Sequence, residues 1–581
     1  MVVYYCDKDH IEVNTSVCPH CMERTRPIQS RIFWCYNCQT PLYKEKCAIC
    51  GETGQQIGSD IRPVFPEERI LLESILYCQN GKEISLAGKS VWNASGNRYF
   101  VNGEKIKLAI GKLKELNTGQ IREGFYERIE KLEDYNKDFP SEVERFIKAN
   151  QERFWQTDKE ALEYIREFAK QYSMEDMMVS FSGGKDSTVV ADLVTRALDT
   201  GNQKVLHIFG DTTLEFPKTY EYVERYKKAH PKTLVLSSRN KEKDFGKLCM
   251  EIGPPSRVMR WCCTIFKTGA ITRKIEKVFR NKTHIITFYG IRRSESASRS
   301  KYEKETESPK IAKQTVVAPI IDWYDFDVWL YLLTRGIDFN DAYRLGYTRV
   351  GCWCCPNNSE WSEFLSKIYM PEYYEPFRTM LINFAKQIGK PDAEVYVDSG
   401  KWKARQGGNG VSAAQKSIVA FTPCATEENT FHYELQRPIS EEFYEFFKPF
   451  GTLNFDIGNK RLGEVYVIGK KGNMLLRLQG RIGKSELKIT VLDHHIGGMR
   501  NLTGAKEKIE CQITKYQMCM GCLACEGICK VNAIQIRESG EQIIYHIDEK
   551  KCIHCGHCVG HFIGGCYIRK VLAIKRDYSQ T

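Results

Sequence analysis

The hexapeptide Ser182-Gly183-Gly184-Lys185-Asp186-Ser187 is the clearest chemical signal in this 581-residue chain. Two adjacent glycines let the backbone approach an anion closely, a helix start presents unpaired N–H groups, and Lys185 adds a positive charge. The hexapeptide therefore predicts a phosphate or sulfate site. Its spacing differs from that of a Walker loop.

Cysteines are the second source of chemistry, and the chain contains 24 of them. In a reducing compartment so many cysteines are more often metal ligands than disulfides. A C-x2-C-x8-C-x2-C pattern near the N-terminus predicts a structural zinc site of four thiolates. Three thiols further upstream need a fourth ligand, for which we predict His10, with His20 as the competitor. The predicted zinc ligands are Cys35, Cys38, Cys47 and Cys50 in one site, and Cys6, His10, Cys18 and Cys21 in the other.

The C-terminal region has two further cysteine runs, Cys519-x2-Cys522-x2-Cys525-x3-Cys529 and Cys552-x2-Cys555-x2-Cys558-x7-Cys566. They resemble those of bacterial two-cluster ferredoxins, in which the fourth cysteine of each run binds the other cluster. Two zinc sites are the alternative, but they suit such runs less well. The resemblance implies two 4Fe-4S clusters that deliver electrons, one on Cys519, Cys522, Cys525 and Cys566 and one on Cys552, Cys555, Cys558 and Cys529.

Four more segments follow the hexapeptide in order: residues 211–217, Arg260-Trp261-Cys262-Cys263 with Lys267, Gly290-Ile291-Arg292-x2-Glu295-Ser296-x2-Arg299, and residues 319–329. Together they resemble the phosphoadenylyl-sulfate (PAPS) and adenylyl-sulfate reductase family, a branch of the PP-loop ATP pyrophosphatases. The similarity covers roughly residues 150–410. It implies an oxidoreductase with a third 4Fe-4S cluster on Cys262, Cys263, Cys352 and Cys355.

The family's nucleophile motif, Glu-Cys-Gly-x-His, does not occur in this chain. Four thiols remain unassigned and could substitute for it. None has a neighbouring sequence that argues for a lowered pKa. These thiols are Cys249, Cys354, Cys424 and Cys511.

The charged residues of these motifs suggest roles. Arg292 and Arg299 can bind a second anionic group through their guanidinium forks, and Lys185 and Lys267 can neutralise charge on a leaving phosphate. These four residues are the predicted catalytic groups, and Glu295 is expected to orient the arginines. Asp186 and Asp211 hold Mg²⁺ if the substrate is ATP, or otherwise cap the loop. The predicted nucleotide site comprises Ser182, Gly183, Gly184, Lys185, Asp186, Ser187, Asp211, Gly290, Arg292, Glu295 and Arg299.

Alternating strands and helices must position these groups. Buried strands are predicted at 177–181, 204–210, 233–238, 284–290 and 315–321, and helices at 188–198, 218–230, 266–279 and 325–334. This alternation predicts a doubly wound parallel α/β sheet, here of the PP-loop (adenine nucleotide alpha hydrolase-like) type, with its ligand at the carboxyl ends of the strands. The expected domains are zinc ribbons (1–56), a small α+β module with charged helices (57–150), the PP-loop domain (151–410), an α+β domain of unknown role (411–510) and a ferredoxin-like domain (511–581).

Composition limits the class of protein. No apolar stretch approaches the roughly 18 residues of a membrane span, and no secretory signal is visible, so we expect a cytoplasmic protein. The net charge is +12, and the basic window 241–310 suits a nucleotide or nucleic acid.

Three functions are weighed. The first is a sulfonucleotide reductase that receives electrons from a donor protein or the fused ferredoxin. The second is an ATP-dependent sulfurtransferase acting on tRNA or DNA, and the third is a non-catalytic redox sensor. A homo-oligomer is compatible with all three.

Overall fold

The structure is a computed structural model in which most of the chain is described. The residues that it does not describe are 1–3, 7, 10, 14–16, 24–25, 28–30, 82, 95–97, 108–112, 114, 202, 242, 258, 296–298, 309–312, 405–418, 520, 522–524, 527–528, 540–541 and 560–581. The predicted ligands His10, Cys522 and Cys566 therefore lie outside the described residues.

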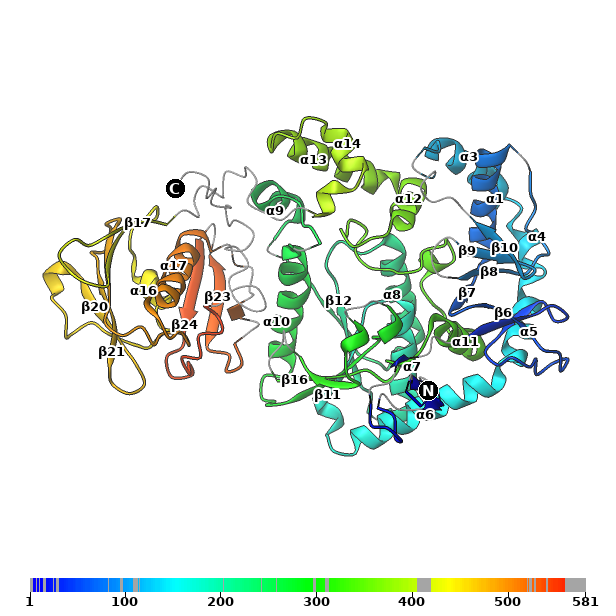
Figure 1. Ribbon diagram of the computed structural model, residues 1–581, viewed down its shortest axis with the longest axis horizontal. Helices are drawn as coiled ribbons and strands as arrows, with labels where there is room; N and C mark the ends of the chain where they lie inside the picture. Colours follow the sequence, from blue (N-terminus) through cyan, green and yellow to red (C-terminus); the bar gives the residue numbers. More distant parts are fainter. Residues whose placement is uncertain are drawn as a thin grey trace.

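A six-stranded sheet forms the centre of the molecule, in the order β13-β12-β11-β14-β16-β15 (Figure 1). The first five strands are parallel and β15 joins the edge antiparallel. Chain order therefore reverses between β11 and β14, which opens a crevice at the carboxyl ends of these two strands. The strands are β11 (Met177–Phe181), β12 (Leu206–Gly210), β13 (Val235–Ser238), β14 (Ile285–Tyr289), β15 (Glu305–Glu307) and β16 (Gln314–Val317).

Helices cover both faces of this sheet, and the predicted doubly wound α/β core is confirmed. Two predicted elements differ in detail. The last parallel strand ends at Val317 because Pro319 follows in a turn, and the helix predicted over 266–279 begins as π-helix at Cys263–Thr268. The helices are α6 (Gln151–Ala169), α7 (Lys185–Leu198), α8 (Pro217–Ala229), α9 (Phe245–Ile252), α10 (Gly269–Val278), α11 (Asp325–Arg335), α12 (Glu360–Tyr369), α13 (Pro371–Gln387) and α14 (Ala393–Asp398).

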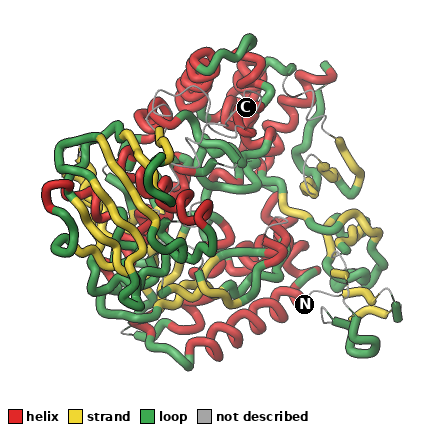
Figure 2. Tube along the Cα trace, turned by 60° about the vertical axis from the view of Figure 1, so that its left-hand side comes forward, coloured by secondary structure: helices red, strands yellow, loops and turns green. Residues whose placement is uncertain are grey.

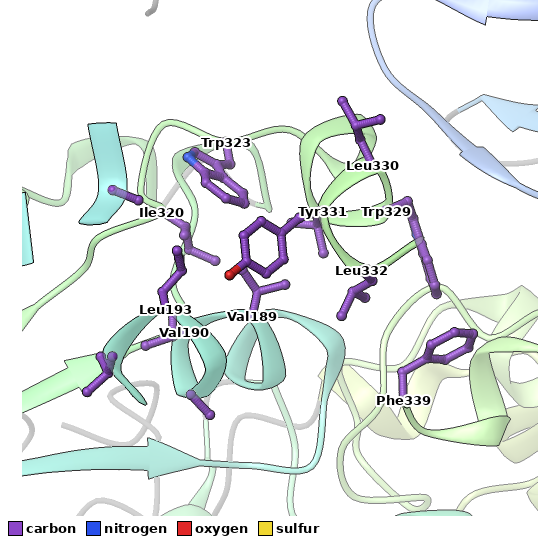
Figure 3. Packing of buried hydrophobic residues seen from close by; sticks show 14 of the residues in the cluster. Val189, Val190, Leu193, Ile320, Trp323, Trp329, Leu330, Tyr331, Leu332 and Phe339 are labelled. Atoms are coloured by element: carbon purple, nitrogen blue, oxygen red, sulfur yellow. The ribbon is translucent and has the colours of Figure 1, made fainter. Parts of the chain in front are cut away.

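The core between α7 and α11 fixes the helix that begins at the hexapeptide. Tyr331 of α11 lies between Trp323 and Val189 of α7 (Figure 3). The Tyr331 hydroxyl donates to Asp192 Oδ2 of α7 at 2.5 Å, which satisfies this buried polar group. The two helices are thereby locked together by both apolar and polar contacts.

The N-terminal region packs against α11. Its four-stranded antiparallel sheet has the order β10-β9-β8-β7, and small sheets carry the cysteine-rich segments. The turn at Asn102-Gly103 has φ values of 51° and 88°, which suit these residue types. The elements are β1 (Tyr4–Cys6), β2 (Ile11–Val13), β3 (Arg26–Pro27), β4 (Ile32–Cys35), β5 (Thr40–Leu42), β6 (Gln55–Gly58), β7 (Ile61–Pro63), α1 (Pro66–Asn80), β8 (Val91–Ala94), β9 (Arg98–Val101), β10 (Glu104–Lys107), α3 (Thr118–Ile129), α4 (Leu132–Asn136) and α5 (Phe139–Ala149).

The C-terminal region is rich in strands (Figure 2). A six-stranded antiparallel sheet in the order β17-β18-β22-β21-β20-β19 is followed by a hairpin. Helices α9 and α10 lie on the side of the central sheet that faces this region (Figure 1). Its elements are β17 (Ala420–Pro423), β18 (Thr430–Glu434), α16 (Glu441–Glu445), β19 (Thr452–Asn454), β20 (Glu464–Ile468), β21 (Met474–Gln479), β22 (Glu486–Val491), α17 (Leu502–Met518), β23 (Ile534–Ser539) and β24 (Gln542–Ile547). Among the described residues, no helix is long and apolar enough to cross a bilayer.

Candidate functional site: an anion cavity beside a group of thiols

The predicted anion loop occupies the turn between β11 and α7. Gly183 has a φ of +70°, and an added Cβ would lie 2.8 Å from a methyl group of Thr219. Gly290 directly follows β14 and lies close to the loop, where an added Cβ would lie 2.6 Å from the Asp186 carbonyl carbon. Glycine is required at both positions, the first for conformation and space and the second for space alone. The Ser187 hydroxyl donates to Gly184 O at 2.8 Å and accepts from Ser182 N at 3.1 Å, which closes the loop.

Two cations and two carboxylates form a buried network at this loop. Lys185 lies 3.1 Å from Asp186 and 3.3 Å from Asp325, and Arg292 donates to both carboxylates, to Asp325 at 2.6 Å. Lys185 and Arg292 are each 3% exposed. Burial lowers the pKa of Lys185, but Asp186 and Asp325 raise it further, so the lysine stays charged. The structure thus brings together two predicted catalytic cations and adds Asp325, which the sequence marked only as a helix start.

A further carboxylate reaches this network from the N-terminal region. Asp60, just before β7, accepts hydrogen bonds from the backbone N–H groups of Asp325 and Phe326, both at 3.0 Å. It thereby caps the N-terminus of α11. Burial and the charge of Asp325 raise the pKa of Asp60 to about 7, although Arg292 opposes the shift. No motif surrounds Asp60 in the sequence, so sequence reasoning missed it.

These groups line a cavity of about 290 Å³. Lys185, Arg292 and Glu295 line it from the central domain, and Asp60 and Arg62 line it from the N-terminal region. The α+β module of residues 57–150, to which the sequence assigned no role, therefore forms one wall of the anion site.

The other predicted nucleotide-site residues have distinct partners. Glu295 accepts a hydrogen bond from Arg292 N at 3.3 Å and forms an ion pair with Arg299, as expected of an orienting residue. Asp211 pairs with Arg239 at 2.7 Å and accepts from Tyr220 at 3.0 Å. Each carboxylate predicted to hold Mg²⁺ is thus already engaged, Asp186 by Lys185 and Arg292 and Asp211 by these two residues.

The central cysteines are linked to the cavity through Arg349, which lines it and whose charge acts on the Cys355 thiol. Cys263 begins the π-helix that also carries Lys267, and Cys352 lies in a loop that docks on residues 211–217, where Trp353 N donates to Leu214 O at 2.9 Å. Cys352 Sγ lies 3.3 Å from Thr212 Oγ1. Desolvation lowers the pKa of Lys267, but Glu215 and the thiols of Cys263 and Cys352 more than offset this effect. Lys267 therefore stays charged and interacts with the thiols of Cys263 and Cys352, whereas its predicted role at a leaving phosphate stays a prediction.

The spacing of sulfur atoms separates two kinds of cysteine group. The sulfurs of Cys35, Cys38, Cys47 and Cys50 all lie within 4.8 Å of one another, as four thiolates around one zinc ion at about 2.3 Å would. The central set, Cys262, Cys263, Cys352 and Cys355, is fully described but forms no group this tight.

The upstream cysteine set contains one described residue that was not predicted, while the predicted ligand His10 lies outside the described residues. Asp9 joins Cys6, Cys18 and Cys21 in a second tight group, and Asp9 Oδ2 accepts from Cys18 Sγ at 3.0 Å. His20 is exposed and is not part of that group. The described ligands at this site are therefore three thiols and a carboxylate.

Two of the described C-terminal cysteines, Cys525 and Cys558, lie near the buried Lys515. Cys525 and Cys558 are 6% and 9% exposed, and Lys515 of α17 donates to Cys558 O at 2.7 Å. Burial raises the pKa of both thiols, and the charge of Lys515 opposes the rise. A cation at this position favours the thiolate ligands that an iron–sulfur cluster requires.

The unassigned thiols differ from one another. Cys249, Cys354 and Cys511 are buried, and burial raises the pKa of Cys354. By contrast, hydrogen bonds with Thr426 and His432 lower the pKa of Cys424 to about 6. Cys424 therefore has a lowered pKa, for which its neighbouring sequence had given no argument.

Comparisons with known proteins agree with this architecture. The phosphoadenosine phosphosulfate reductase domain matches residues 176–358, and the 4Fe-4S dicluster domain matches residues 518–561. An uncharacterized protein of Methanocaldococcus jannaschii is 30% identical over 278 residues, which cover 48% of this chain and 61% of that protein. The match thus spans less than two thirds of that relative. Adenosine 5'-phosphosulfate reductase of Anoxybacillus flavithermus is 28% identical over 33% of this chain and 77% of that enzyme.

A solved structure was also found. The phosphate complex of phosphoadenylyl-sulfate (PAPS) reductase from Candida auris aligns with a TM-score of 0.28 and 17% identity, over 35% of this chain and 96% of that one. The fold and the domain matches define an α/β protein in which residues 176–358 match the phosphoadenosine phosphosulfate reductase domain and residues 518–561 match the 4Fe-4S dicluster domain. These matches agree with the predicted α/β core and the predicted ferredoxin-like region.

Proposed function

We propose that the chain is an enzyme that reduces a sulfonucleotide, PAPS or adenylyl sulfate, to sulfite and the adenosine phosphate. The observation that carries the proposal is the meeting of two sites. A cavity lined by Lys185, Arg292 and Arg349 lies in the region that matches the phosphoadenosine phosphosulfate reductase domain, and the same region carries the thiols of Cys352 and Cys355. Arg349 connects them, because it lines the cavity and its charge acts on the Cys355 thiol.

The reaction makes specific demands on these residues. Two electrons reduce the sulfur from S(VI) to S(IV), the S–O bond to the phosphate breaks, and the phosphate leaves with an additional negative charge. Lys185 and Arg292 can stabilise that charge, because both remain cationic in a buried site. Bound iron–sulfur clusters supply the electrons, with Cys262, Cys263, Cys352 and Cys355 as the proposed ligands nearest the cavity.

An internal electron supply is supported by the packing of the C-terminal region. Trp261 and Phe266, which flank Cys262 and Cys263, belong to one buried apolar cluster with Ile536 of β23. Arg273 of α10 donates to Ile536 O at 3.4 Å. The ferredoxin domain therefore packs directly against the segment that carries two of the central thiols.

Turnover with defined electrons tests the proposal. Anaerobically purified full-length protein, given reduced methyl viologen and either adenylyl sulfate or PAPS, should release sulfite together with AMP or adenosine 3′,5′-bisphosphate. Lys185→Met should abolish the release of sulfite. The control variant Lys218→Met, which changes a partly exposed lysine on α8, should still release sulfite. Absence of sulfite from both nucleotides would refute the proposal.

ATP-dependent sulfur transfer to tRNA or DNA is the second candidate. The two tight N-terminal cysteine groups favour it, since zinc sites of this kind often accompany nucleic-acid binding. In this case the same loop would bind ATP, and pyrophosphate would be released. Release of pyrophosphate from ATP, coupled to salt-sensitive RNA or DNA binding, would replace the first proposal with this one.

A further inference from the structure

A cationic residue outside every predicted set lies at the thiol side of the cavity. We propose that Arg349 binds the terminal oxyanion of the nucleotide and holds it between the hexapeptide loop and Cys355. This inference rests on the proposed nucleotide site and adds to it a second anion subsite. The ligand class is an adenine nucleotide whose outer group is a tetrahedral sulfonate or phosphate.

Charge pairing distinguishes Arg349 from the other cations of the cavity. Arg62 pairs with Glu68 at 2.7 Å, and Lys185 and Arg292 share Asp186 and Asp325. Arg349 lines the same cavity and is exposed. Across the residues that the structure describes, no carboxylate forms an ion pair with it. Arg349 can thus offer its full guanidinium fork to a ligand.

The backbone holds Arg349 between the two halves of the site. On one side, the carbonyl of Thr348 accepts from Lys185 Nζ at 3.4 Å. On the other side, Cys352 forms a bridge with Glu215, in the loop that follows β12. The segment from Thr348 to Cys352 therefore runs from the anion loop to the thiols.

The electrostatic neighbours of Arg349 agree with this position. Burial raises the pKa of Cys355, and the charge of Arg349 opposes that rise. Burial and repulsion from Arg349 lower the pKa of Arg299. Its guanidinium therefore lies near both a proposed cluster ligand and a predicted anion-binding arginine, where an anionic ligand would relieve the repulsion.

The chemistry of guanidinium suits this task. Its parallel N–H groups match two oxygens of a tetrahedral oxyanion, which lysine cannot do. With Lys185 and Arg292 at the inner phosphate, Arg349 would select nucleotides that carry a further anionic group. AMP lacks that group, so its binding affinity should not depend on Arg349.

Isothermal titration of the full chain with adenylyl sulfate, ATP and AMP tests the inference. Arg349→Ala should weaken the binding of adenylyl sulfate and ATP by roughly 10- to 100-fold, the size expected for loss of a charge-assisted pair. The affinity for AMP should change by less than about 2-fold. The affinity of Arg349→Lys for adenylyl sulfate and ATP should lie between those of the wild type and Arg349→Ala. Arg260→Ala is the matched control, because Arg260 also acts on the Cys355 thiol but does not line the cavity.

The outcomes separate this inference from the proposed function. Equal weakening of AMP and the longer nucleotides, or no weakening at all, would overturn the role of Arg349. Wild-type protein that binds ATP but not adenylyl sulfate would refute reduction of adenylyl sulfate, while the ATP arm would still decide on Arg349. Wild-type protein that binds none of the three probes would contradict both the role of Arg349 and the reduction of adenylyl sulfate.

Discussion

Gly290→Ala should disable nucleotide binding through the backbone alone. The new Cβ would lie 2.6 Å from the carbonyl carbon of Asp186 and 2.7 Å from Ser187 N. Backbone atoms cannot rotate aside, so the loop must move by roughly 1 Å to restore normal contact. That shift moves Lys185 and Asp186 relative to Arg292 and Asp325, with which they form the buried network.

The magnitude follows from overpacking and misplacement. Overpacking of this kind costs about 1–3 kcal/mol, which lowers the melting temperature by roughly 2–12 °C for a domain of this size. A misplacement of about 1 Å in a site typically costs about 100-fold in function. We therefore expect a folded variant with nucleotide affinity reduced by about 100-fold.

Calorimetric titration and thermal melting check this prediction together. Gly351→Ala is the control, because its Cβ would meet no atom within 4 Å and its φ lies outside the left-handed region. A Gly290→Ala protein that binds nucleotide with wild-type affinity would refute the account of the loop.

Three further predictions follow from single groups. Burial and the charge of Asp325 raise the pKa of Asp60 to about 7 in the folded protein, compared with about 3.9 in the unfolded chain. Protonated Asp60 therefore stabilises the fold fully below about pH 4, and this stabilisation is lost as the pH rises through 7. Urea unfolding should therefore show a shallower loss of stability between pH 5 and 8 in Asp60→Asn; an unchanged slope would contradict the shift. Cys424, with a pKa of about 6, should react with iodoacetamide at a rate that is half-maximal near pH 6, and a midpoint near 9 would exclude its thiolate character. Cys352→Ser should lower the iron content by about four atoms per chain and leave zinc unchanged, whereas Cys47→Ser should lower zinc alone; loss of both metals in either variant would argue against separate sites.

The part of the site that sequence reasoning could predict is the part that follows strand ends. Residues 182–187 follow β11, and Gly290 and Arg292 follow β14. Parallel strands present their carboxyl ends at one edge of the sheet, so motifs in successive loops converge there. Local pattern and one topological rule were therefore sufficient for Lys185, whereas Arg292 was identified through the family resemblance.

The missed residues depend on contacts that no local pattern records. Asp60 reaches α11 across more than 260 positions of sequence. Arg349 lies in an irregular segment without apolar periodicity, and its importance comes from the cavity that it lines. The pKa of Cys424 is lowered mainly by hydrogen bonds with Thr426, and a smaller part comes from His432, which the pairing of β17 with β18 brings near it. Such long-range juxtapositions follow from register and packing, which composition and spacing do not specify.

The central claim is that this cavity holds a sulfonucleotide whose sulfur is reduced. The most direct measurement follows ³⁵S-labelled adenylyl sulfate and PAPS with the reduced, anaerobic full-length protein, and quantifies labelled sulfite against the adenosine phosphate formed. We predict that one of the two nucleotides gives sulfite and adenosine phosphate in a 1:1 ratio. Label that remains in the nucleotide, with pyrophosphate released when ATP is supplied instead, would contradict the claim.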